Sequence, residues 1–305
     1  MASVDRVRCR RISLARKTIR CSQRVKRESV IAEVEHLQRL RHSHVVQVIG
    51  TYVIGNYLSI LLYPATEYNL ETFMDSIFDE EETSVEKDRL ARLYLLPSFF
   101  LCLATALDHI HQNVTKHMDI KPQNLLVRDI RQSRAIPPKD GFKIYVADFG
   151  IAKAYQSVAD AETDSPTACT IKYSAPEVVA QKMRGLSADI FSLGCVYTEM
   201  LAVIASNGSA DKRQELKSLR ESNISSSTSY QANVPMIVAW MNNLNLNESR
   251  MHILRTETIK MLSSEPELRP SATNLVNAFS LLRKFYDCRC DDGPDLLESG
   301  PGHPA

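Results

Sequence analysis

The segment that decides the fold is HMDIKPQN, residues His117–Asn124, which follows an apolar stretch. It carries an acid at Asp119, a lysine at Lys121 and an amide at Asn124. Pro122 lacks a backbone N–H and fixes its own φ angle, so the segment cannot continue as a regular helix. We therefore expect three polar side chains on a turned, irregular segment.

A second acid comes further along the chain, in the triplet Asp148-Phe149-Gly150 (DFG). The triplet follows KIYVA, an apolar sequence typical of a strand. Two carboxylates, a lysine and an amide can together bind magnesium and phosphate, because hard cations prefer oxygen ligands and stay in contact with substrate phosphates. The two segments therefore indicate a site for magnesium and phosphate.

Three short motifs occur in a fixed order: HMDIKPQN at 117–124, DFG at 148–150 and SAPE at 174–177. In this order and spacing they resemble the catalytic loop, the metal-binding triplet and the end of the activation segment of the protein kinase superfamily. Within that superfamily the resemblance is to the serine/threonine kinases. One motif alone would say little, since DFG occurs by chance in many chains. The alternative interpretation is three unrelated polar loops of a mixed α/β protein.

The resemblance implies an α+β fold with two lobes. Residues 1–63 would form a small β-rich N-lobe, truncated in this chain, with strands and the family's helix C. Residues 64–286 would form a mainly helical C-lobe with the catalytic loop and the activation segment. The glycine, proline and acidic residues of 287–305 indicate a disordered tail.

The resemblance also implies a reaction, the transfer of the γ-phosphoryl group of ATP, with Mg²⁺, to a serine or threonine of a protein substrate. Such a reaction depends mainly on position and charge. Asp119 would accept the hydroxyl proton, and Lys121 would contact the nucleotide and neutralise charge on the transferred group. Asn124 and Asp148 would hold the magnesium ions.

The small lobe would hold the rest of the nucleotide. Lys17, in the strand-like ISLARKTI, resembles the lysine that binds the α- and β-phosphates. Its partner would be Glu33, on an amphipathic helix that the apolar periodicity predicts over 28–41. The competing candidate is Glu35.

The hinge between the lobes is expected at LLYPA, residues 61–65. In the resemblance, backbone groups of Leu61, Leu62 and Tyr63 would bind adenine. Pro64 removes one N–H from this stretch, so the number of hydrogen bonds to adenine stays open.

Two positions resemble structural residues of the family. Asp189 would be the buried aspartate that braces the catalytic loop, and Arg269 would pair with Glu177 of SAPE. Both expectations are physically consistent, because a buried charge persists only when it is paired.

The chain departs from the family upstream of Lys17. No glycine precedes Gly50, whereas the family has a GxGxxG loop whose amides cover the phosphates. We expect the first strand to be absent, the second to be at most partial, ATP to bind more weakly and an exposed sheet edge to allow self-association. The alternatives to an active kinase are a pseudokinase or scaffold with weak or no catalysis, and a fragment of a longer chain.

A second departure is Met118, where the family commonly has an arginine that pairs with a phosphate on the activation segment. Ser165 and Thr167 are candidate phosphate acceptors in that segment, but they would lack this partner. We therefore expect that activity does not depend on their phosphorylation.

The composition is that of a soluble globular protein, with 44% apolar and 24% charged residues in 305. The net charge of +1 gives no reason to expect nucleic-acid or membrane binding. Seven scattered cysteines predict reduced thiols in an intracellular protein, cytoplasmic or nuclear. The sequence has no run of about 18 uncharged apolar residues, so we expect no transmembrane helix.

Overall fold

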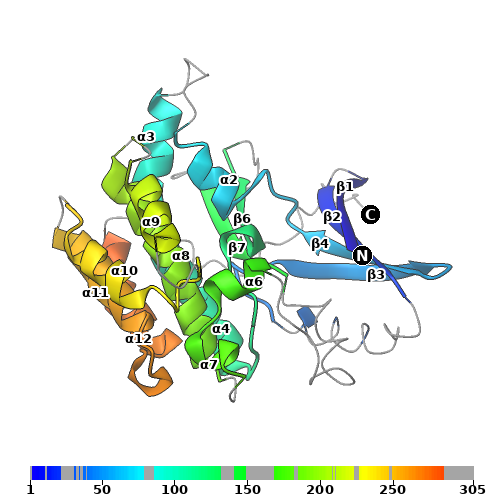
Figure 1. The fold of residues 1–305 in the computed structure, drawn as a ribbon. Helices are drawn as coiled ribbons and strands as arrows, with labels where there is room; N and C mark the ends of the chain where they lie inside the picture. The colour runs from blue at the N-terminus through cyan, green and yellow to red at the C-terminus, as the bar shows by residue number, and fades with distance from the viewer. Residues whose placement is uncertain are drawn as a thin grey trace.

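The computed structural model contains two β-sheets and a set of helices (Figure 1). The four-stranded sheet lies at one end, the helices lie at the other, and the three-stranded sheet lies between them. The structure describes residues 2–10, 12–21, 31, 34, 37–38, 40–78, 86–131, 141–148, 168–181, 185–207, 209, 211–222, 227–246 and 249–284. The expected α+β fold is confirmed.

The four-stranded sheet, called the small sheet below, is antiparallel with the strand order β1-β2-β4-β3. Its strands are β1 (Ala2–Cys9), β2 (Ile12–Arg20), β3 (Gln47–Ile54) and β4 (Tyr57–Tyr63). β3 and β4 form a hairpin around Gly55, whose φ of 57° is a conformation that glycine adopts readily. Leu58 and Ile60 of β4 are buried in the core of this sheet.

The strand before the Lys17 strand is complete, so our expectation of an at most partial strand is wrong. All eight residues of β1 pair with β2, from Ala2 opposite Ile19 to Cys9 opposite Ile12. Most side chains of β1 are exposed, so backbone pairing rather than burial holds the strand in place. β1 is one edge of an open sheet.

The three-stranded sheet carries the two site segments. It consists of β5 (Tyr68–Asn69), β6 (Leu125–Asp129) and β7 (Phe142–Val146), in that order and all antiparallel. HMDIKPQN leads into β6 through the short 3-10 helix η1 (Pro122–Asn124), and β7 leads to Asp148. Because Leu125 pairs with Val146, both segments lie at the same end of the sheet.

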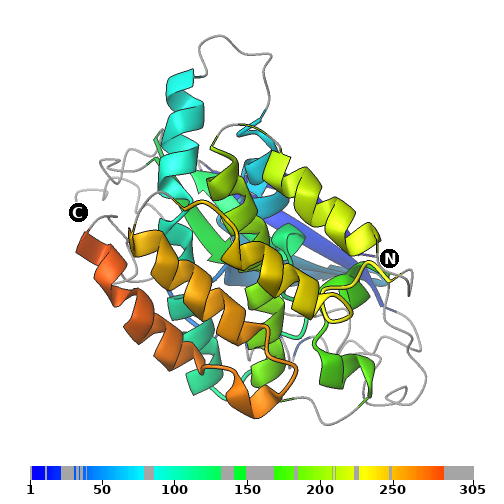
Figure 2. The same cartoon turned by 60° about the vertical axis from the view of Figure 1, so that its left-hand side comes forward.

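The helices form the largest part of the described chain. They are α2 (Leu70–Asp75), α3 (Glu86–Leu95), α4 (Ser98–Gln112), α6 (Ala168–Tyr173), α7 (Pro176–Val179), α8 (Ser187–Ser206), α9 (Asp211–Glu221), α10 (Val234–Asn242), α11 (Ser249–Met261) and α12 (Ala272–Phe279), with 3-10 segments η2 (Pro266–Leu268) and η3 (Ser280–Lys284). The helices from α8 onward, green to orange in Figure 2, lie in front of the strands.

Helix α8 is the centre of the helical core. It is long and apolar enough to cross a membrane by length and composition, but 83% of its most apolar window is buried inside the protein. Asp189 and Glu199 on this helix are both buried. A helix that is apolar on all sides and packed in this way is typical of the core of a large domain.

Several helix ends differ from the sequence pattern. Ser187 has the chemistry of an N-cap, but it is the first helical residue of α8, and Leu186 occupies the cap position without a side-chain hydrogen bond. Pro97 is the residue before α4 rather than part of its first turn. Asn113 is the C-cap residue of α4. Helix α6 is not predicted by the sequence.

Three sequence predictions lie largely outside the described residues: the helix over 28–41, the activation segment over 148–177, which is described only at 148 and 168–177, and the tail over 287–305. The proposed boundary between lobes after residue 63 stays a proposal. β4 ends at Tyr63, and the chain then enters the linker 64–67 that leads to the three-stranded sheet.

Candidate active site

The polar residues of HMDIKPQN are in direct contact. Lys121 Nζ donates to Asp119 Oδ2 at 2.8 Å. Asn124 Nδ2 donates to the same carboxylate oxygen at 3.0 Å and to the Asp119 carbonyl oxygen at 2.8 Å. The Asp119 side chain is only 11% exposed, so its carboxylate is oriented by these donors rather than by water.

Asp189 of α8 holds this loop from the protein interior. Its two carboxylate oxygens accept the backbone N–H groups of His117 and Met118, each at 2.8 Å. His111 Nε2 lies 3.2 Å from Oδ2. Asp189 is 1% exposed, and a carboxylate at that depth needs such partners. The expected bracing role of Asp189 is confirmed.

His117 links the loop to the segment that carries Asp148. The Asp119 N–H donates to His117 Nδ1 at 3.3 Å, so Nδ1 is an acceptor and Nε2 carries the hydrogen that bonds the Ala147 carbonyl oxygen at 2.9 Å. Burial lowers the pKa of His117, although the Asp189 carboxylate opposes the shift. A neutral His117 therefore fixes Asp119 relative to the residue before Asp148.

Lys17 and Asp148 form an ion pair across the two sheets. Lys17 Nζ lies 2.5 Å from Asp148 Oδ1, although the residues are 131 positions apart. The Lys17 side chain is 8% exposed, whereas that of Asp148 is 45% exposed. The expected phosphate-binding lysine and the expected metal-binding carboxylate thus lie at one place, where Asp148 is open to solvent.

Backbone strain accompanies both site segments. Met118 and Asp148 have φ angles of 65° and 59°, in the left-handed region that costs energy for residues other than glycine. The Asp189 carboxylate accepts the Met118 N–H and so supports this conformation. Such conformations persist only where the surrounding structure determines them, and they cluster at functional sites.

Comparisons with known proteins identify the family of this chain. A family model described as "Protein kinase domain" matches residues 3–279. The chain belongs to the protein kinase family.

Individual kinases resemble the chain more modestly. It is 28% identical to cyclin-dependent kinase E-1 of Arabidopsis thaliana, over 57% of this chain and 35% of that protein. It is 33% identical to a calcium/calmodulin-dependent protein kinase of Metarhizium anisopliae, over 56% of this chain and 40% of that protein. It is 30% identical to cyclin-dependent kinase 7 of Dictyostelium discoideum, over 57% of this chain and 42% of that protein. The match thus spans less than half the length of these relatives.

The second structural pair expected from the kinase resemblance is also confirmed. Arg269 Nη1 and Nη2 donate to the two carboxylate oxygens of Glu177 at 2.7 and 2.8 Å. Both residues are buried, and Arg269 also donates to the Ser187 carbonyl oxygen at the start of α8. This pair fixes the end of the SAPE segment on the helical core.

The expected hinge residues lie partly within a strand. Leu61 and Leu62 are in β4, where β2 and β3 pair with them on either side. Their backbone N–H and C=O groups are therefore used in pairing with the neighbouring strands. Tyr63 is paired with β3 only, and its hydroxyl accepts a hydrogen bond from Arg128 at 2.8 Å. Adenine binding by Leu61, Leu62 and Tyr63 stays a prediction, with Tyr63 the best placed of the three.

Glu33 and Glu35 lie outside the described residues, so the predicted contact between Lys17 and Glu33 stays a prediction. Sequence reasoning missed Val4, which pairs with Lys17 across β1 and β2 and is 64% exposed. Cross-strand partners point to the same face of a sheet, so Val4 adds an open apolar surface beside Lys17.

The site residues fit a magnesium ion. Asn124 uses its Nδ2 group on Asp119, which leaves its Oδ1 oxygen for a cation, and Asp148 is an exposed carboxylate with one oxygen on Lys17. Among the described residues, no group of three or more His, Cys, Asp or Glu side chains could hold a metal ion. Magnesium suits such a sparse set, because it usually binds one or two protein oxygens together with substrate phosphates and water.

Proposed function

We propose that the chain transfers the γ-phosphoryl group of ATP to a serine or threonine hydroxyl of a protein substrate. The contact of Lys121 and Asn124 with the Asp119 carboxylate carries this proposal, because it orients an acceptor for the hydroxyl proton. The similarity to serine/threonine kinases such as the calcium/calmodulin-dependent and cyclin-dependent enzymes supports the substrate class.

Each site residue has a proposed role. Asp119 positions the hydroxyl and accepts its proton, and Lys121 neutralises charge on the transferred group. Lys17 holds the α- and β-phosphates, while Asn124 and Asp148 would hold Mg²⁺, which supplies charge neutralisation when bound. Because Lys17 and Asp148 already contact each other, nucleotide and metal would have to share that contact.

The test is phosphate transfer from magnesium-ATP to the chain itself and to a generic basic protein. We expect Asp119→Asn to lower the rate by about 10²–10⁴-fold, the usual contribution of a positioned acid or base. Asp108→Asn is the matched control, since Asp108 lies on α4 and bonds Gln112 and Thr273. Equal rates for the Asp119 variant and the unmodified chain would contradict the proposal. Nucleotide binding without any transfer would favour the scaffold alternative.

Self-association through β1 stays a proposal, and the charges on the strand do not favour it. Antiparallel pairing of β1 with a second copy around Asp5, Arg6 or Val7 would place like charges opposite one another, which is destabilising. Charged side chains on an edge strand are a common protection against such pairing. The intracellular location expected from the sequence also stays a prediction.

A further inference from the structure

A polar link joins the edge strand β1 to the linker 64–67 and to the three-stranded sheet. Arg6 Nη2 donates to the Thr66 carbonyl oxygen at 3.1 Å and lies 3.3 Å from Glu67 Oε1. The other oxygen of Glu67 accepts the Asp129 N–H at the end of β6, at 2.8 Å. One carboxylate oxygen of Glu67 thus contacts the small sheet, and the other contacts the three-stranded sheet.

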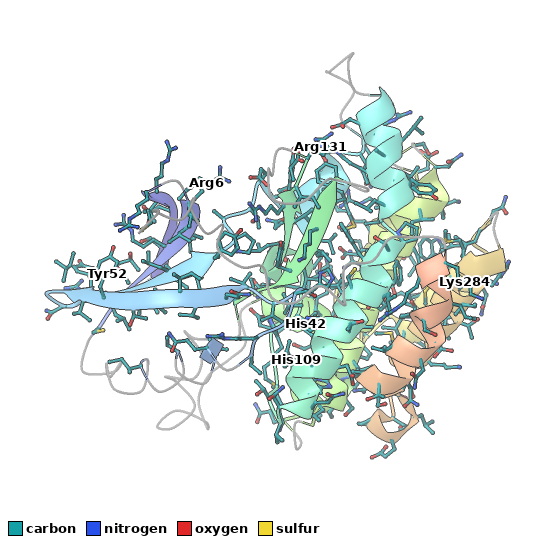
Figure 3. The ribbon with its side chains drawn as sticks, turned by 180° about the vertical axis from the view of Figure 1, so that it is seen from behind. Arg6, His42, Tyr52, His109, Arg131 and Lys284 are labelled. Carbon is teal, nitrogen blue, oxygen red and sulfur yellow. The ribbon has the colours of Figure 1, made fainter. Side chains whose placement is uncertain are left out.

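The far end of this link is firmly held. The Asp129 carboxylate binds Arg131 through Nε at 3.0 Å and Nη2 at 2.6 Å. Arg131 also pairs with Asp88 of α3 and lies over the Phe142 ring at 4.7 Å. Figure 3 shows Arg6 on the small sheet and Arg131 next to the three-stranded sheet, on the same side of the molecule. The link therefore joins a lightly held strand to a well-anchored one.

The position of Arg6 relates the link to the proposed active site. Arg6 pairs with Ala15 and Val4 pairs with Lys17, so Arg6 and Lys17 share one face of the small sheet. Lys17 connects this face to Asp148, and Arg6 connects it to the linker. The exposed apolar side chain of Val4 lies on the same face, directly opposite Lys17 and two residues before Arg6.

The near end of the link can open easily. The side chains of Arg6 and Glu67 are 54% and 38% exposed. An ion pair that exposed adds little net stability, and dissolved salt screens it further. A contact of this strength can be made and broken as the two sheets approach or separate.

We propose that the contact between Arg6 and Glu67 is a salt-sensitive strap that holds the Lys17-bearing face of the small sheet towards the three-stranded sheet and so favours binding of the magnesium-nucleotide complex. Arg6 and Glu67 are positioning residues, because they affect nucleotide binding only by setting the position of the sheet face that carries Lys17. This inference rests on the proposed function for the identity of the ligand.

The test measures the dissociation constant of a fluorescent ATP analogue with magnesium for Arg6→Met, Glu67→Gln and the double variant. Glutamine keeps an oxygen for the Asp129 N–H but loses the charge that faces Arg6. We expect each single variant to bind about 3–10-fold more weakly at about 50 mM salt, and the double variant to bind no more weakly than either single variant. The difference should vanish at about 500 mM salt, where exposed charges are screened.

The control is Arg8→Met, which removes an exposed arginine further along the same strand. It should leave nucleotide binding unchanged. In the phosphotransfer assay, the strap variants should raise KM for ATP and leave kcat unchanged, which a general loss of structure would not do. Multiplicative losses in the double variant, losses that persist at high salt, or an equal loss in Arg8→Met would overturn the proposal.

Amide hydrogen exchange separates the strap from the proposed function. If the chain binds no nucleotide, the proposed function fails, but the strap can still be read from the exchange rates of Ala2–Cys9. These amides should exchange faster in Arg6→Met and Glu67→Gln than in Arg8→Met. Identical exchange in all three variants would overturn the strap even if nucleotide binding is found.

Discussion

The two sides of the proposed active site are held in contrasting ways. The side that carries Asp119 rests on buried groups, since Asp189 is 1% exposed and the side chains of Arg269 and Glu177 are 0% and 8% exposed. The β1 edge of the small sheet, next to the strand that carries Lys17, is held by surface pairs, such as Arg6 with Glu67. The difference indicates that the side with Asp119, the proposed proton acceptor, is fixed in advance, whereas the side with Lys17, the proposed nucleotide-binding residue, is adjustable.

Removal of Asp189 should produce the largest effect on the fixed side. Asp189→Ala leaves the N–H groups of buried His117 and half-buried Met118 without their acceptor, and a buried N–H left in this way costs about 1–3 kcal/mol. We expect the free energy of unfolding to fall accordingly and phosphotransfer to be lost with the loop geometry. Urea unfolding followed by the fluorescence of the single tryptophan, Trp240, measures the first effect.

The control for this experiment is Asp75→Ala. Asp75 pairs with Arg213 on the surface, and its side chain is 53% exposed, so its loss should cost less than about 1 kcal/mol. Equal losses for the two variants would show that the fixed side is not held by its buried carboxylate.

The second largest effect should follow from the removal of Arg269, the ion-pair partner of Glu177. Burial alone would raise the pKa of Glu177, but hydrogen bonds from Arg269 hold it below its usual value. Arg269→Leu leaves that carboxylate buried without its partner, which costs about 3–5 kcal/mol. The double variant with Glu177→Leu should lose less than the single variant, because no buried charge remains. A double variant as unstable as the sum of the single variants would argue that packing rather than charge holds this segment.

The junction between the two sides should respond to acid. Burial lowers the pKa of His44 to about 3, although a hydrogen bond to the Ile144 carbonyl oxygen opposes the shift. Lys143, His42 and Tyr145 surround this ring. The His44 carbonyl oxygen also accepts the Val146 N–H at 2.8 Å, two residues before Asp148. A charge on His44 would therefore disturb the strand that leads to the site.

The sign of the pH effect follows from the lowered pKa. The unfolded chain binds a proton on His44 below about pH 6.5, whereas the folded chain resists it down to about pH 3, so stability falls as the pH falls between these values. His44 alone should make the protein about 2 kcal/mol less stable at pH 5 than at pH 7. Urea unfolding at both pH values measures this difference, and His44→Asn should reduce it. An unchanged difference in His44→Asn would assign the acid response to other groups.

The fixed side of the site could be predicted well from the sequence, because its residues lie in compact motifs. Asp119, Lys121 and Asn124 are neighbours in the chain, and only Pro122 was needed to expect a turn. A short sequence motif was therefore enough to predict this local structure.

The contacts of the adjustable side were not predicted, because neither a motif nor the kinase resemblance pairs Lys17 with Asp148 or Arg6 with Glu67. Lys17 contacts Asp148 across 131 positions, and Arg6 contacts Glu67 across 61. β1 is mostly exposed, so its side chains give no apolar alternation to mark a strand. These contacts depend on the register of the paired strands, and a short stretch of sequence does not reveal that register.

The smallest effect should come from Asp5→Asn, and it provides the sharpest check on the comparison. Asp5 pairs with Arg16 at 2.7 Å, and the side chains are 46% and 37% exposed, close to the values for Glu67 and Arg6. The two pairs differ in what they connect, since Asp5 and Arg16 lie opposite each other on strands that backbone hydrogen bonds already join. We therefore expect thermal unfolding and nucleotide affinity of Asp5→Asn to stay within experimental error of the unmodified chain. If Asp5→Asn weakens nucleotide binding as much as Glu67→Gln does, the total charge of the small sheet, rather than its attachment to the linker, controls the adjustable side.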